Sequence, residues 1–143
     1  MRKYYDLQTV DINLQKFRKN GVFKRKTKKL TDADLSVLFC IKFYLDDERI
    51  KLTDISNRLG LTLPAITHKV NYLESRGLVH KIVSNNDKRI INIDLTEKGN
   101  ELVELNQNEY YYSLEKLVEF LGEEDVNELN RILEKANSLG KIK

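Results

Sequence analysis

Two short helical patterns, separated by a glycine and followed by two β-rich runs, constrain this chain more than any other feature. Leu52, Ile55 and Leu59 recur at the spacing of one helical face, and Gly60 permits the left-handed conformation that ends many helices. A second helix is expected from Leu63 to Arg76, because Thr62 can cap its first turn. The order predicts two helices joined by a tight turn.

The second predicted helix has two unlike faces. Ile66, Val70 and Leu73 form a stripe that should be buried. Small, polar or basic residues occupy the other side: Ala65, Thr67, His68, Lys69 and Asn71. Such a helix can pack on a core while it presents a surface that is able to contact nucleic acid.

A β-hairpin is predicted directly after these helices. Residues 78–83 are rich in β-branched side chains, residues 84–87 form a polar turn, and residues 90–95 alternate as a half-buried strand does. Thr96 can then cap a further helix. Helix, turn, helix and hairpin in this order describe a winged helix-turn-helix, which favours binding to duplex DNA.

The same stretch resembles the MarR family of bacterial winged-helix transcription regulators. The family's wing signature is Asp-x-Arg, five residues, then Leu-Thr-x-x-Gly, and Asp87, Arg89 and residues 95–99 match it at that spacing. The ending of the family's recognition helix, Val-x-x-Leu-Glu-x-x-Gly-Leu-Val, matches Val70 to Val79. Several fixed positions at fixed spacing make the resemblance strong over about the middle half of the chain.

The resemblance implies roles for particular residues. The helix would enter the major groove, and Arg89 at the tip of the wing would enter the minor groove, with Asp87 fixing its direction by a bidentate ion pair. The alternatives are a solvated polar face and an ordinary exposed turn pair. The implied DNA-binding residues are Thr62, Pro64, Ala65, Thr67, His68 and Lys69 in the recognition helix, with Asp87, Lys88 and Arg89 in the wing.

Histidine occupies position 68, where many relatives carry arginine. A neutral imidazole has one donor and does not grip guanine as a guanidinium fork does. Because nearby phosphates favour the charged imidazole, we expect DNA binding to tighten modestly as the pH falls toward 6. His80, on a strand, is expected to be structural.

Charge is distributed unevenly along the chain. Met1–Arg89 holds 19 Lys and Arg against 10 Asp and Glu, a balance of +9, whereas the remainder holds 6 against 12, a balance of −6. This polarity suits a protein with one basic side toward phosphates. The densest basic segment, residues 16–29, is open to two interpretations, as extra phosphate contacts or as a solvated linker.

Three amphipathic helices are expected outside the winged region. Apolar faces recur in an N-terminal helix, in a long helix from Thr96 to about Phe120, which Gly122 ends, and in a C-terminal helix. The expected organisation is residues 1–30 as an N-terminal helix and basic linker for dimerisation, 31–97 as the DNA-binding domain, and 98–143 as C-terminal dimerisation helices. The resemblance implies a homodimer on a pseudo-palindrome, with half-sites about 10 base pairs apart.

A crevice that binds a small aromatic ligand is also possible to place in the sequence, by its tyrosines. Many MarR-like repressors release DNA when a small aromatic acid binds, and tyrosines combine apolar area with a polar tip. The candidate lining residues are Tyr4, Tyr5, Tyr110, Tyr111 and Tyr112. Ordinary interface packing is the favoured alternative, and three consecutive tyrosines on a helix should include one core and one exposed side chain.

Other classes of function find little support. No paired-carboxylate, glycine-rich phosphate or metal-ligand motif is present, so no catalytic residue, metal or cofactor is expected. Cys40 lies among apolar residues of a helix that begins at Thr31 and should pack as one of them. No apolar run is long enough to span a bilayer, and we expect a cytoplasmic protein.

The sequence therefore predicts a mainly α protein with a small β-wing that acts as a homodimeric, sequence-specific transcription regulator. Repression is favoured over activation. The alternatives are a winged-helix protein-interaction module and a nonspecific DNA-binding architectural protein. Preference for one base sequence separates the first function from both alternatives.

Overall fold

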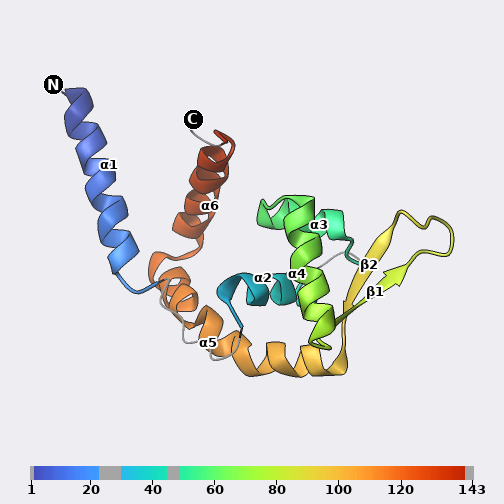
Figure 1. Ribbon diagram of the computed structural model, residues 1–143. Helices are drawn as coiled ribbons and strands as arrows, with labels where there is room; N and C mark the ends of the chain where they lie inside the picture. Colours follow the sequence, from blue (N-terminus) through green and yellow to red (C-terminus); the bar gives the residue numbers. More distant parts are fainter. Residues whose placement is uncertain (1, 23–29, 45–48, 141–143) are drawn as a thin grey trace. The chain divides into compact units, whose positions relative to one another are not determined.

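The computed structural model describes residues 2–22, 30–44 and 49–140 (Figure 1). Within these ranges the chain is mainly helical, with one two-stranded antiparallel sheet. The elements are α1 (Arg2–Lys19), α2 (Asp32–Lys42), α3 (Leu52–Leu59), α4 (Leu63–Ser75), β1 (Val79–Val83), β2 (Ile91–Leu95), α5 (Glu97–Leu121) and α6 (Glu123–Asn137). This confirms the predicted fold class, with element ends within about two residues of those expected from the sequence.

The chain forms two compact units. One comprises residues 25–110 and is called the winged unit below; the other comprises residues 1–24 and 111–143 and is called the flanking unit. Helix α5 belongs to the winged unit up to Tyr110 and to the flanking unit from Tyr111 onward. None of the described helices is both long and apolar enough to cross a membrane.

The core of the winged unit lies where α2, α3 and α4 meet the sheet. Its fully buried side chains come from every element of the unit: Leu35, Val37, Leu38, Ile55, Ile66, Val70, Leu73, Val79, Ile93 and Val103. Each contributes the apolar stripe of its helix or the inward face of its strand. The core therefore fixes which face of α4 remains at the surface.

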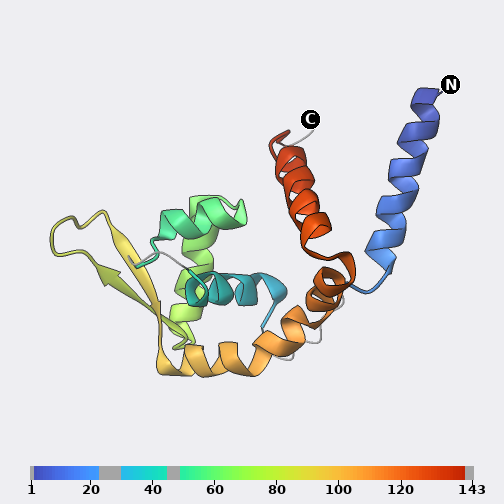
Figure 2. The ribbon, with the colours of Figure 1, turned by 180° about the vertical axis from the view of Figure 1, so that it is seen from behind.

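The hairpin pairs β1 with β2 from Val79 opposite Leu95 to Val83 opposite Ile91. An isolated bridge between Lys51 and Asn92, with the N–H of Ile93 donating to the Ile50 carbonyl at 2.9 Å, attaches the chain before α3 to the free edge of β2. Both views of the ribbon show the far end of the hairpin extending beyond the helices of its unit (Figures 1 and 2). The base of the wing is thus held on the core while its tip lies in solvent.

The junction between the hairpin and α5 explains the Leu-Thr-x-x-Gly motif. The Thr96 hydroxyl accepts the N–H of Gly99 at 3.0 Å and donates to the Gly77 carbonyl at 2.6 Å, so one side chain caps α5 and ties it to the end of α4. The N–H of Thr96 donates to the Leu78 carbonyl at 3.1 Å. A Cβ at position 99 would lie 2.0 Å from that carbonyl oxygen. Only glycine permits this approach of α5 to the residue that precedes β1.

The flanking unit leaves much apolar surface exposed in the single chain. On α1, Leu7, Val10 and Leu14 are each more than half exposed, and Ile132 and Leu133 on α6 are about half exposed. Leu7, Val10, Leu14 and Leu133 lie on the apolar faces that the sequence pattern predicts, and Ile132 adds to the exposed apolar surface of α6. Patches of this kind on a helix commonly mark a protein interface.

Candidate nucleic-acid interface

Helix α4 is positioned by signals at both of its ends. Gly60 adopts the left-handed conformation after α3, with φ of 66°, and so turns the chain. Thr62 then caps α4 by accepting the N–H of Ala65 at 3.3 Å, and Pro64 lies in the first turn, where a missing donor costs little. The predicted cap and turn are therefore confirmed.

The outward face of α4 is the predicted polar one. Ile66, Val70 and Leu73 are completely buried, whereas Ala65 and His68 are exposed. The remaining members of the predicted set on α4 and its cap are at the surface to different degrees: Thr62 and Pro64 are exposed, and Thr67 and Lys69 are half-buried. The Thr67 hydroxyl donates to the Leu63 carbonyl at 2.9 Å, within the helix itself.

Lys69 differs from its neighbours on α4. Its Nζ lies 3.4 Å from Oδ1 of Asp34, a buried carboxylate in the first turn of α2. The same carboxylate completes the capping box with Thr31. Sequence analysis missed Asp34, although the Thr-x-x-Asp spacing from residue 31 to residue 34 is the signal of such a box.

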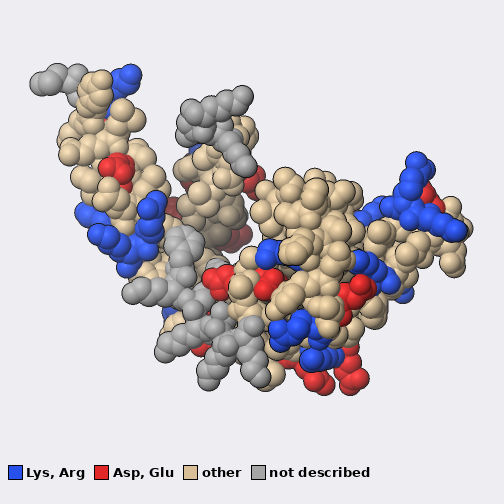
Figure 3. Space-filling model, in the orientation of Figure 1, with Lys and Arg blue, Asp and Glu red and all other residues tan. Residues whose placement is uncertain are grey.

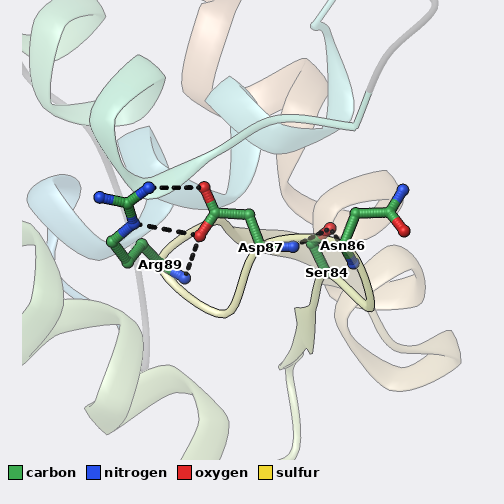
Figure 4. Close-up of polar contacts among 4 residues, drawn as sticks. All are labelled: Ser84, Asn86, Asp87 and Arg89. Carbon is green, nitrogen blue, oxygen red and sulfur yellow. Dashed lines mark hydrogen bonds and ion pairs between the residues drawn. The ribbon is translucent and has the colours of Figure 1, made fainter.

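The wing turn is held by a dense set of hydrogen bonds (Figure 4). The Ser84 hydroxyl accepts the N–H groups of Asn86 at 3.3 Å and Asp87 at 3.4 Å. Asp87 in turn binds Arg89 three times: Oδ1 accepts the backbone N–H at 3.0 Å and Nε at 3.2 Å, and Oδ2 accepts Nη2 at 3.3 Å. The predicted bidentate pair is confirmed.

The pair orients a guanidinium that remains in solvent. The Arg89 side chain is 92 % exposed and that of Asp87 34 % exposed. Hydrogen bonds from the Arg89 side chain and backbone lower the pKa of Asp87 below its ordinary value. The carboxylate is therefore charged at neutral pH and keeps Arg89 in place. Lys88 is exposed between them, and basic atoms gather at the end of the wing in Figure 3.

Lys81 connects the wing to α4 and was not predicted as a site residue. Its N–H donates to Oε2 of Glu74 at 3.3 Å, and its Nζ contacts Asn71 and lies 3.7 Å from Oε1 of Glu74. Both partners belong to α4. Strand β1 and α4 are thereby held at a fixed separation.

The remaining candidates fall in different environments. Tyr110 is 6 % exposed, stacks obliquely on Phe39 at 4.6 Å between ring centroids, and shares a 2.8 Å hydrogen bond with Ser36. Tyr112 is 59 % exposed. One core and one exposed tyrosine were expected, and both are found. Tyr111 is half-buried, and Tyr4 and Tyr5 on α1 are exposed.

Cys40 and His80 differ in their exposure to solvent. Cys40 is buried, as predicted, and burial raises the pKa of its thiol. His80 is exposed on β1 opposite Asp94. Half of the basic segment 16–29, residues 23–29, lies outside the described residues; Lys16, Arg18 and Lys19 are exposed at the end of α1.

Comparison with known proteins agrees with this geometry. The family model described as MarR matches residues 30–91. A cysteine-to-serine mutant of Escherichia coli MarR complexed with operator DNA is 26 % identical over 76 % of each chain, with a TM-score of 0.60. The Staphylococcus aureus MepR–DNA complex is 26 % identical over 92 % of this chain and 87 % of that one, with a TM-score of 0.64.

A second Staphylococcus aureus MepR structure, described as in the DNA-binding conformation, covers 99 % of this chain and 94 % of its own at 24 % identity, with a TM-score of 0.70. That likeness concerns the fold and extends it to the flanking helices. The family match covers the helix-turn-helix and the wing as far as the first residue of β2. Residues 30–91 of this chain therefore match the MarR family of transcription regulators, and the chain shares the winged-helix fold of MarR and MepR structures.

Proposed function

We propose that this protein is a sequence-specific double-stranded-DNA-binding repressor, acting in the cytoplasm as a homodimer on a pseudo-palindromic operator. Members of the MarR family are DNA-binding regulators rather than enzymes, and we propose the same for this chain. Helix α4 would lie in the major groove and contact DNA through Thr62, Pro64, Ala65, Thr67 and His68. Asp87, Lys88 and Arg89 would bring the wing to the adjacent minor groove.

One observation carries the proposal: the Arg89 side chain at the wing tip is 92 % exposed, and its guanidinium is nevertheless oriented by two hydrogen bonds to Asp87, which also accepts the Arg89 backbone N–H. An exposed side chain with several rotatable bonds loses conformational entropy when it is fixed, and an exposed ion pair stabilises a fold little. Preorganisation of this kind is useful when the guanidinium must enter a narrow, strongly negative groove. Its location in a MarR-family domain supports DNA as the partner.

The experiment is selection of duplexes from a random-sequence pool, followed by fluorescence-anisotropy titration. The selected duplex and a scrambled one of the same composition are compared at two salt concentrations. A regulator should prefer the selected duplex by about 10³-fold or more. Equal and steeply salt-dependent binding to both would favour an architectural protein, and no binding would favour a protein-interaction module.

The homodimer part of the proposal rests on the flanking unit. The apolar side chains of Leu7, Val10 and Leu14 share one face of α1 and are 55 to 58 % exposed. Covering this face with a second copy would remove it from water and would place two winged units on one duplex. Sedimentation at micromolar concentration should give a dimer; a monomer there would contradict the proposal.

Release by a small aromatic ligand is the remaining part. A surface hollow of about 310 Å³ in the flanking unit is lined in part by Tyr112, Ser113 and Lys116. The ammonium of Lys116 lies 5.5 Å from the centre of the Tyr112 ring. A ring that stacks on the tyrosine and a carboxylate near the lysine would suit an aromatic acid. Benzoate should weaken binding of the selected duplex, and Lys116→Met should abolish that effect while leaving ligand-free DNA binding unchanged.

A further inference from the structure

Asp34 is the one charged side chain that is buried among the residues that the structure describes, with 5 % of its surface exposed. Its Oδ2 accepts the N–H of Thr31 at 3.4 Å, and its backbone N–H donates to the Thr31 hydroxyl at 3.1 Å. Its Oδ1 is 3.4 Å from Nζ of Lys69 on the recognition helix. A buried carboxylate is costly without a counter-charge, and Lys69 supplies it.

Lys69 is correspondingly unlike the exposed cations of the wing. Its side chain is 28 % exposed, against 92 % for Arg89. It follows Ile66 by three residues and precedes Leu73 by four, so it lies beside the buried stripe of α4 rather than opposite it. The ammonium is directed to α2, whereas the adjacent His68 is exposed.

From these contacts we infer a role for Asp34 that rests on the DNA-binding function proposed above: it is a positioning residue that withholds Lys69 from DNA. If Lys69 moved to a phosphate, it would leave a buried carboxylate without its cation and with a phosphate anion nearby. Lys69 therefore fixes α4 against α2 instead of adding a phosphate contact. The contacts of the recognition helix come from its cap through His68, which differs from the role that the family resemblance implies for Lys69.

The salt dependence of DNA binding tests this directly, because each phosphate neutralised by a cation adds about 0.9 to the slope of log K against log salt. The selected duplex is titrated with the parent protein, Lys69→Gln, Asp34→Asn and the double variant. Asparagine retains an oxygen for the Thr31 N–H but no charge. Arg89→Ala provides the reference for loss of one DNA-contacting cation.

We expect Lys69→Gln to leave the slope unchanged. Asp34→Asn should release the lysine and steepen the slope by about 0.9, with tighter binding at low salt. The double variant should return to the parent slope, which general loosening of the fold would not produce. The double variant also removes the unpaired charge, so it remains informative if a single variant does not fold.

Two results would overturn the inference: a slope that falls by about 0.9 in Lys69→Gln, showing that Lys69 already contacts a phosphate, or an unchanged slope in folded Asp34→Asn. The double variant and Lys69→Gln should have the same slope, because Asp34 would affect the slope only through Lys69. A difference between these two slopes would also contradict the inference. Failure of the parent protein to bind any selected duplex would refute the proposed function itself. The two failures are therefore distinguishable.

Discussion

Replacement of Gly99 by alanine should destabilise the winged unit, although alanine is the better helix former. In an open helical position the change would stabilise by up to about 1 kcal/mol. Here the added Cβ would lie 2.0 Å from the carbonyl oxygen of Leu78, which is backbone and cannot rotate away. Helix α5 and Leu78 must separate by 1.4 Å to bring this distance from 2.0 Å to an ordinary van der Waals contact of 3.4 Å.

That separation acts on the hydrogen bonds at the same junction. The N–H of Thr96 donates to Leu78 at 3.1 Å, and its hydroxyl donates to Gly77 at 2.6 Å. Loss of both costs about 2 kcal/mol, and the overpacking adds about 1 to 3 kcal/mol. After the gain in helix propensity is subtracted, we expect a net loss of about 3 kcal/mol.

Urea and thermal unfolding followed by far-UV circular dichroism, at one protein concentration, measure this loss. For a chain of this size the melting temperature should fall by about 9 °C. Gly60→Ala is the matched control, because Gly60 has open space around it and a φ of +66°. It should lose about 1 kcal/mol through backbone strain alone. Equal or greater stability of Gly99→Ala than of the parent would refute the reasoning.

Three further predictions concern the wing, His68 and the core. Arg89→Ala should weaken binding to the selected duplex and lower the salt slope by about one unit. The control Arg131→Ala removes another exposed arginine paired with a carboxylate and should leave the slope unchanged. Equal slopes for both variants would contradict the wing assignment. DNA binding measured from pH 8 to pH 6 should tighten modestly in the parent and in His80→Gln but not in His68→Ala. The pKa of Asp87 is lowered, so its pair with Arg89 is lost only as the pH falls through that lowered value. Asp87→Asn should therefore keep the response to pH. Tyr110→Phe should cost about 1 kcal/mol in urea unfolding by removing the hydrogen bond to Ser36, and no measurable loss would show that the bond does not contribute.

Elements whose signals are local could be predicted from the sequence. The left-handed Gly60 ends α3, and the side chains of Thr62 and Thr96 cap α4 and α5 through backbone N–H groups three residues later. Each of these roles was predicted and found. The pair of Asp87 and Arg89, which the family resemblance implied, is likewise local, because its partners are two positions apart in a tight turn. The buried stripe of α4 followed from its period.

Tertiary structure decided what depends on residues far apart in the chain. That Lys69 faces Asp34, 35 positions earlier, depends on how α2 packs on α4, and periodicity placed Lys69 only on a polar face. Tyr110 became a core residue because Phe39 and Ser36 lie against it. The need for glycine at position 99 likewise arises from the approach of α5 to Leu78. Local patterns fix caps and faces, but long-range packing decides which charges are free to meet a partner.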